Sequence, residues 1–215
     1  ANLYLVGELN GWNNSGSLDH KFYFSKSDET TYAGLFNFTF PGVYKLIQEL
    51  GNWNTQYRMV VGGTATAGEF IQENSDPAFP GPSPAGWYRI YVEFQTGTYR
   101  AVPGPERVTP PAELWLVGDV NGWNNSTSLD PRYKFTRVDE FNYSIDVDFA
   151  GGGFYKLIQN LGNWGTQFHM LSGGTQFGGE FEQRDADPAF IGPSEAGRYH
   201  INVNFASNLF TVTKL

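Results

Sequence analysis

The stretch VGELNGWNN at residues 6–14 returns almost unchanged as VGDVNGWNN at residues 117–125. Aligning each residue with the one 111 positions later needs no gap from Leu3 to Val102, and 51 of these 100 pairs are identical. A repeat of this length is a duplicated domain, because each copy is long enough to bury a core of its own. We therefore expect a first domain over residues 1–102, a proline-rich linker over 103–111 and a second domain over 112–215.

Each copy is built from short runs rich in aromatic and β-branched residues, separated by clusters of Gly, Pro, Asn and Asp. Within residues 88–94, strict alternation places Tyr88, Ile90, Val92 and Phe94 on one face of a strand. No apolar period of 3.6 residues persists for three turns, so we expect little helix. Seven or eight strands in about 100 residues favour an all-β immunoglobulin-like antiparallel β-sandwich, with a small barrel as the alternative architecture.

Composition excludes several classes of function. The net charge of −8 and the absence of any basic stretch argue against a nucleic-acid partner. The chain has no cysteine, which removes disulfides and thiolate metal sites. No run of 18 apolar residues is present, and the chain opens directly on a predicted strand. Either the protein is cytoplasmic or a targeting segment lies outside this sequence.

Polar and aromatic loop residues shared by both copies are the most informative, because folding alone requires less of loops than of strands. They form four groups. The groups are NGWNN at 10–14 and 121–125, YKLIQ at 44–48 and 155–159, LGNW at 50–53 and 161–164 followed by Gln56 and Gln167, and the polar stretches 69–79 and 180–190.

The shared tryptophans have two interpretations. Each indole could fold back to cap the sandwich. Alternatively, it could form a platform for a sugar ring, since the C–H face of a pyranose packs on an electron-rich indole while amides and charged donors bind its hydroxyls. Nucleobases also stack on aromatic rings, but the acidic charge of this chain makes that interpretation poor.

Lys45 and Lys156 lie in predicted strands. Alternation places Lys45 and Ile47 on one face, opposite Tyr44 and Leu46. A lysine on an exposed strand face is ordinarily just a solvated side chain. Because a loop tryptophan follows eight residues later in both copies, a donor to sugar hydroxyls is the alternative interpretation, and both stay open.

No pattern in the sequence indicates catalysis. A glycosidase needs two carboxylates roughly 5–10 Å apart, one with a raised pKa, and no shared acid has apolar surroundings that would raise its pKa. The three histidines have no counterpart in the other copy, and no nucleophile motif, metal-spaced cluster or phosphate loop is present. We therefore expect no catalytic residue, no metal and no cofactor. The shared acids are Asp19, Asp28, Glu29, Glu69 and Asp76, with their copies.

The order LYLVGELNGWNN, VYKLIQELGNW, a Gly-rich stretch and GWYRIYVEFQTGTYRAV resembles the tandem C-terminal modules of the SusE/SusF family. These are surface glycan-binding lipoproteins of Bacteroidetes, best known from starch utilisation. The start V-G-x-x-N-G-W is also similar to the glycogen-binding modules of branching enzymes and kinase β-subunits. The resemblance implies immunoglobulin-like β-sandwiches, no catalysis, and a lipid anchor preceding Ala1 that holds the protein at the outer face of the outer membrane.

The resemblance also implies a site in each module. An aromatic pair follows the curve of a malto-oligosaccharide, and this pair corresponds to Trp12 with Trp53. A family arginine matches Arg184, but the first module has Glu73 there. A family asparagine is replaced by Asp76 and its copy. These departures imply that the second module binds differently from the first.

We predict non-catalytic binding of a polysaccharide, most simply starch or a malto-oligosaccharide, with avidity from two sites. Chitin or xylan on the same platform, and a structural or adhesion protein using tryptophan-tipped loops, are the alternatives; a fragment of a glycan-acting enzyme is a more distant one. Expected partners are the glycan and other surface proteins of an uptake system. The predicted carbohydrate-binding residues are Trp12, Asn14, Lys45, Gln48, Trp53, Asp76, Trp123, Asn125, Lys156, Gln159, Trp164, Arg184 and Asp187.

Overall fold

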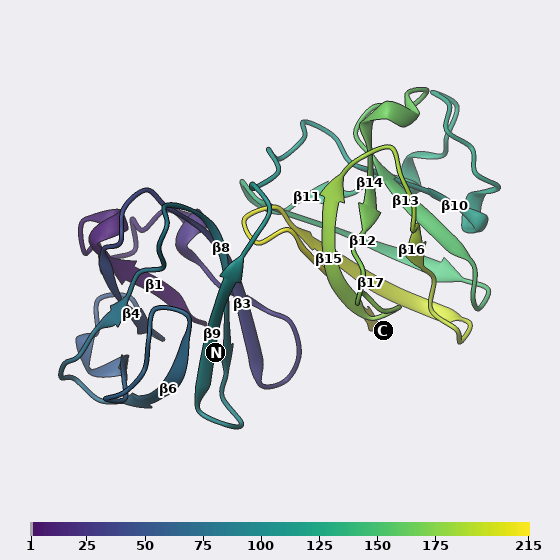
Figure 1. The fold of residues 1–215 in the computed structure, drawn as a ribbon. Helices are drawn as coiled ribbons and strands as arrows, with labels where there is room; N and C mark the ends of the chain where they lie inside the picture. The colour runs from purple at the N-terminus through teal and green to yellow at the C-terminus, as the bar shows by residue number, and fades with distance from the viewer. Residues whose placement is uncertain (1) are drawn as a thin grey trace. The chain divides into compact units, whose positions relative to one another are not determined.

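The chain folds as two all-β units in the computed structural model, which describes residues 2–215 (Figure 1). The first unit ends at Arg107 and the second begins at Val108. Each unit is an antiparallel β-sandwich of nine strands in a curled sheet arrangement, so the predicted fold class is confirmed.

The strands repeat with the same lengths in both units. In the first unit they are β1 (Tyr4–Gly7), β2 (Ser25–Lys26), β3 (Thr31–Phe38), β4 (Val43–Ile47), β5 (Gln56–Met59), β6 (Ala67–Gln72), β7 (Phe79–Pro80), β8 (Gly86–Glu93) and β9 (Thr98–Pro103). In the second they are β10 (Trp115–Gly118), β11 (Thr136–Arg137), β12 (Asn142–Phe149), β13 (Phe154–Ile158), β14 (Gln167–Met170), β15 (Gly178–Gln183), β16 (Phe190–Ile191), β17 (Gly197–Asn204) and β18 (Leu209–Lys214).

The strand order in the first unit is β1-β4-β5-β6-β9-β8-β3-β2, with β7 paired to β4. Strand β6 joins the two layers, because its second half pairs with β5 and its first half with β9. The sequence did not predict this strand: Phe70 is its one buried residue, so it lacks the alternating pattern of a half-buried strand.

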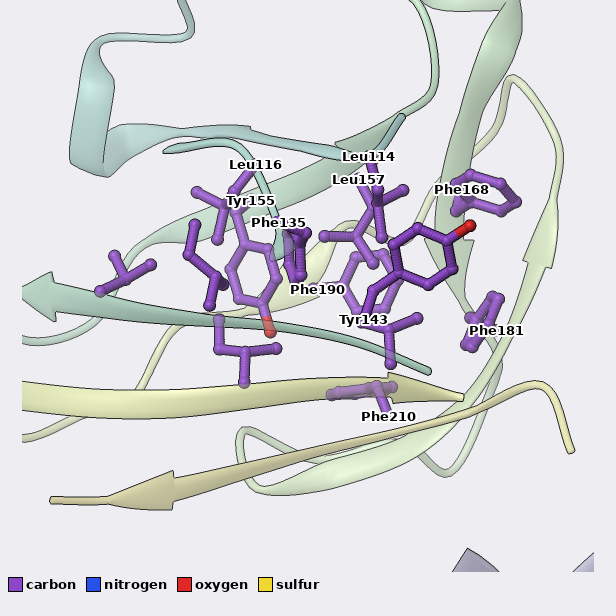
Figure 2. Close-up of a cluster of buried hydrophobic side chains, with 14 of the residues drawn as sticks. Leu114, Leu116, Phe135, Tyr143, Tyr155, Leu157, Phe168, Phe181, Phe190 and Phe210 are labelled. Atoms are coloured by element: carbon purple, nitrogen blue, oxygen red, sulfur yellow. The ribbon is translucent and has the colours of Figure 1, made fainter. Parts of the chain in front are cut away.

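The core of each unit is dominated by aromatic rings from both layers. Figure 2 shows this cluster in the second unit, with Phe168, Phe181 and Phe190 among its rings. Phe168, Phe181 and Phe205 make mutual edge-to-face contacts with centroids 5.2–5.8 Å apart. Such contacts favour one packing arrangement over others. Tyr88, Ile90 and Val92, predicted to share one face of β8, are all buried, and Arg89 on the opposite face is buried as well.

A second, smaller apolar cluster covers the outer face of β1 and β4. Tyr4, Val6 and Ile47 form it together with Leu18, which comes from the loop between β1 and β2. This loop therefore folds back over the sheet, and a bridge between Tyr4 and Tyr23 holds its far end. Burial of Leu18 brings the NGWNN turn onto the β4 side of the unit.

The proline-rich segment predicted as a linker is divided between the two units. The N–H of Gly104 donates to the Trp87 carbonyl at 2.9 Å, and the guanidinium of Arg107 donates to the Lys21 carbonyl at 2.8 Å. The N–H of Val108 donates instead to Asn208 Oδ1 at 3.2 Å, within the second unit. The segment is thus held by hydrogen bonds on each side of the boundary at residues 107 and 108.

The contact between β1 and β4 depends on the small size of Gly7. A Cβ at this residue would lie 2.4 Å from the Val43 carbonyl oxygen, and backbone atoms cannot move aside as a flexible side chain can. We expect Gly7→Ala to lower the free energy of unfolding of the first unit by about 1–3 kcal/mol, the usual cost of overpacking. Scanning calorimetry measures the change.

Gly16→Ala is the matched control, because Gly16 has nothing within 4 Å of a Cβ. It should change stability by no more than about 0.5 kcal/mol. Equal effects of the two substitutions would contradict the importance of this close approach.

Candidate functional site

The NGWNN turn is held in one conformation by its own asparagine. The side chain of Asn10 accepts from the Gly7 N–H at 3.0 Å and donates to the Leu5 carbonyl at 2.8 Å. Gly11 and Trp12 then both adopt positive φ, 60° and 59°. A left-handed conformation at a bulky residue costs on the order of 1–3 kcal/mol and persists only where the surroundings enforce it. Trp123 in the second unit has φ 57°.

Asn14 ties this turn to the loop that carries Trp53. Its Oδ1 and its carbonyl oxygen both accept from the N–H of Gly51, at 2.9 and 3.1 Å. Asn125 makes the same contact with Gly162 at 2.9 Å. The Nδ2 atoms of both asparagines are buried, while each residue as a whole is half-buried. These residues therefore position the two loops, and a direct contact of either asparagine with a ligand stays a prediction.

The loop after β4 is also ordered locally. Asn52 Oδ1 accepts from the Asn54 N–H at 3.1 Å and begins the short 3-10 turn η3 (Trp53–Thr55). Asn163 begins the equivalent turn η6 (Trp164–Thr166) with a bond of 3.0 Å to Gly165. These contacts account for the repeated LGNW motif: its asparagine caps the turn and fixes the backbone that carries the tryptophan.

The four loop tryptophans form one pair in each unit. The ring centroids of Trp12 and Trp53 lie 6.4 Å apart with their planes tilted by 47°. Trp123 and Trp164 are also 6.4 Å apart, tilted by 42°. All four side chains are exposed, between 36% and 39%, and none belongs to a core cluster. The rings therefore offer an angled apolar surface to solvent, which does not fit the interpretation of indoles folded back as caps.

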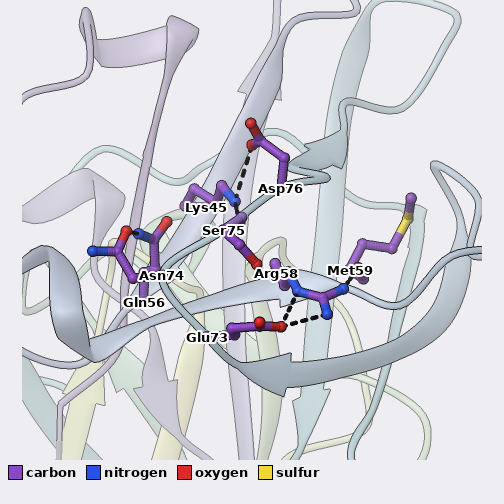
Figure 3. Close-up of polar contacts among 8 residues, drawn as sticks. All are labelled: Lys45, Gln56, Arg58, Met59, Glu73, Asn74, Ser75 and Asp76. Atoms are coloured by element: carbon purple, nitrogen blue, oxygen red, sulfur yellow. Dashed lines mark hydrogen bonds and ion pairs between the residues drawn. The ribbon is translucent and has the colours of Figure 1, made fainter.

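Lys45 does not lie on a solvated strand face, which contradicts the interpretation of a solvated lysine. It shares the outer face of β4 with Ile47, but its side chain is only 5% exposed and contacts the loop before β7. Its ammonium donates to the Ser75 carbonyl and lies 3.3 Å from Asp76 Oδ1 (Figure 3). Lys156 is equally buried, donates to the Ala186 carbonyl and lies 3.2 Å from Asp187 Oδ1.

The buried lysine therefore supports the loop before β7 and holds the carboxylate of Asp76 at the surface. Asp76 and Asp187 are each 90% exposed at the side chain, so each carboxylate keeps acceptor capacity toward solvent. A ligand would meet the aspartate, and the lysine would act through it. Alternation alone cannot reveal this, because it does not tell which loop covers the face of a strand.

Gln56 and Asn74 lie beside the Trp53 turn and were not among the predicted site residues. Asn74 Oδ1 accepts from the buried Gln56 (Figure 3). Asn74 Nδ2 donates to Asn54 Oδ1 at 3.1 Å. In the second unit Asp185 takes the place of Asn74 and accepts from Gln167. The sequence feature that could have indicated these residues is the glutamine after LGNW, which both copies share. The structure buries this glutamine, and its amide therefore needs a hydrogen-bond partner.

Gln48 lies apart from the tryptophan pair. It borders a separate hollow with Tyr32 and Phe94 on the other side of β4. Its copy Gln159 is half-buried at the end of β13. The inclusion of these two glutamines in a glycan site stays a prediction.

The two units differ near the end of β6. In the first, Arg58 Nε donates to Glu73 Oε2 at 2.6 Å (Figure 3). In the second, His169 replaces Arg58 and pairs with Glu182 at 2.9 Å. Arg184, at the position of Glu73, is consequently exposed, with its nearest acid oxygen 4.0 Å away.

Asp28 and Glu113 have carboxyl pKa values that are shifted downward. Backbone N–H groups of Thr30 and Thr31 hydrogen-bond the carboxylate of Asp28 and lower its pKa. A hydrogen bond from Lys134 lowers the pKa of Glu113. General-acid catalysis near neutral pH instead needs a raised carboxyl pKa.

Within residues 2–215, no group of three or more His, Asp or Glu side chains could hold a metal ion. The same residues contain no helix with the length and apolar character to span a bilayer.

Comparison with known proteins gives remote likenesses. Residues 1–103 match the model of a domain of unknown function, DUF8037. No curated protein matches the chain. A crystal structure of SusF from Bacteroides thetaiotaomicron is 18% identical with a TM-score of 0.40, and the match covers 99% of this chain and 48% of SusF. The ligand-induced structure of AmyP-SBD is 22% identical with a TM-score of 0.36, covering 53% of this chain and 79% of that one. At these values neither likeness carries a functional assignment.

The hydrogen bonds from Gly51 to Asn14 and from Gly162 to Asn125, called here the asparagine clamp, lead to a testable consequence. Replacing both Asn14 and Asn125 with alanine removes one side-chain hydrogen bond per unit and should cost about 1 kcal/mol each. The tryptophan rings of each pair should then lose their fixed tilt. We expect a weaker exciton couplet from the paired indoles in circular dichroism.

Asn13→Ala with Asn124→Ala is the matched control, since the side chains of these neighbouring asparagines hydrogen-bond to nearby serines of their own loop. An unchanged couplet in the Asn14, Asn125 variant would show that the clamp does not hold the rings.

Proposed function

We propose that the protein binds a polysaccharide without transforming it, through one tryptophan platform in each unit. The observation that carries this proposal is the exposed, tilted pair formed by Trp12 and Trp53 and repeated by Trp123 and Trp164. Two sugar residues of one chain can pack on two rings 6.4 Å apart. Aromatic faces recognise pyranose C–H groups, while nearby Asn and Asp side chains bind hydroxyls.

The tilt of the rings favours a curved glycan. Rings tilted by 42° to 47° fit a chain whose successive residues change direction, as in an α-1,4-glucan. A flat, extended chain would lie better on coplanar rings. Starch or a malto-oligosaccharide is therefore the ligand that we propose. Chitin, xylan or another polymer on the same platform is the alternative.

The duplication has a physical rationale under this proposal. A site with two stacked sugars and a few hydrogen bonds binds weakly, with a dissociation constant on the order of the high micromolar to millimolar range. Two such sites on one chain gain from effective concentration if both can engage one polymer. A structural or adhesion protein using the same loops for protein contacts is the competing function. Attachment at the outer face of the outer membrane, expected from the SusE/SusF resemblance, stays a prediction.

Removal of one ring from each pair tests the proposal. Trp12→Ala with Trp123→Ala should abolish retention of the chain on insoluble starch, because each remaining ring can hold a single sugar. Each single variant should retain part of the binding through the other unit. Pull-down against a panel of insoluble polysaccharides measures this, with circular dichroism to check the fold.

The control is Phe177→Thr, which removes an exposed aromatic ring outside both pairs. Full retention of the double tryptophan variant would contradict the platform, and retention of the parent by no polysaccharide would contradict the function. Release of reducing sugar from a pure polymer would show that the protein is an enzyme.

A further inference from the structure

The second unit has a hollow beside its tryptophan pair. Trp123, Phe154, Asp187, Pro188 and Ala189 line it, with a volume of about 380 Å³. This size lies within the range of small-ligand pockets, about 300–1,000 Å³. Trp123 borders the hollow and also forms the pair with Trp164, so the hollow and the pair share this indole.

Phe154 is the residue that distinguishes this surface from that of the first unit. It is the first residue of β13, in register with Ile191, and its side chain is 54% exposed. Val43 holds the same position in β4, opposite Pro80. Because the Phe154 side chain is exposed, it contributes little apolar burial to the core. Its ring instead forms an aromatic wall of the hollow.

The preceding loop also differs. The first unit has Phe40, whose ring packs over Gly42 and beside Glu8. The second unit has three glycines at 151–153, all with positive φ. This loop therefore places no side chain next to Phe154 in the sequence.

A single carboxylate holds the two aromatic walls in place. Asp119 Oδ1 accepts from the indole N–H of Trp123 at 2.8 Å, and Asp119 Oδ2 accepts from the Phe154 N–H at 2.7 Å. The orientation of the indole is thereby coupled to the backbone that carries Phe154. Preorganised walls reduce the entropy that a ligand must lose on binding.

The rim of the hollow offers a hydrogen-bond acceptor. Asp187 is held by Lys156 at 3.2 Å while 90% of its side chain stays exposed. Apolar walls with a carboxylate at the edge suit a neutral sugar, which presents C–H faces and donates hydroxyls. A negatively charged ligand would be repelled.

We propose that this hollow is an additional subsite for a neutral hexose, so that the second unit binds a longer stretch of α-glucan than the first. Its occupant is the next residue of the chain that lies on Trp123 and Trp164. The inference rests on the proposed glycan-binding function and adds to it a difference between the two units.

The test measures how affinity depends on oligosaccharide length. The full chain carrying Trp12→Ala and Trp53→Ala reports the second unit alone, with maltose to maltoheptaose as probes in isothermal titration calorimetry. Phe154→Val, which installs the residue of the first unit, should weaken binding of the longer oligosaccharides about three- to tenfold. Binding of the shortest oligosaccharide that spans the tryptophan pair should not change. Phe154→Tyr, which keeps the ring, should behave like phenylalanine.

Phe177→Thr is the matched control, because it also exchanges an exposed phenylalanine of the second unit for the residue of the first. It should leave every affinity unchanged. An unchanged length dependence in Phe154→Val, or an equal loss at all lengths, would overturn the subsite while leaving the tryptophan platform intact. If the Trp12→Ala, Trp53→Ala chain with Phe154 intact binds none of the oligosaccharides, the subsite is overturned. If the unmodified chain is also retained by no polysaccharide of the panel, the proposed function is contradicted as well.

Discussion

Burial of Leu18 against the outer face of β1 and β4 is the interaction on which the exposed surface of the first unit depends. An open sheet face would leave Val6 and Ile47 in water, and the returning loop removes them from it. The same fold-back carries Trp12 to the loop of Trp53, where the Asn14 contact with Gly51 locks the two together. A packing requirement thus decides where the aromatic rings of the proposed site meet.

Because the domain is duplicated within one chain, the contacts that both units share can be compared with the surface residues that differ between them. The asparagine contacts, the buried lysine and the tryptophan spacing are the same in both units. The rims differ instead: Phe154 replaces Val43, and Arg184 is exposed where Glu73 pairs with Arg58. Substitutions at a rim cost little stability, since no core packing depends on them, and so the two surfaces can differ in what they bind.

The alternating pattern in the sequence predicted the apolar face of β8, and no such pattern indicated β6. The difference is physical, because alternation arises only where one face of a strand is buried along its whole length. β6 changes partners halfway and buries only Phe70. Both interpretations of Lys45 assumed an exposed side chain, and the structure instead buries it against Ser75 and Asp76, in a loop that is distant in sequence.

By itself, the sequence determined the repeat, the all-β class and the identity of the four tryptophans, because periodicity and residue type are local properties of the chain. Only the tertiary structure decided that Trp12 and Trp53 lie side by side and exposed, that Lys45 acts beneath Asp76, and that Asn74 is part of the same surface. These relations join residues many positions apart, and they depend on how the loops fold over the sheet. No local pattern encodes them, because burial of a loop is settled by the packing of the whole unit.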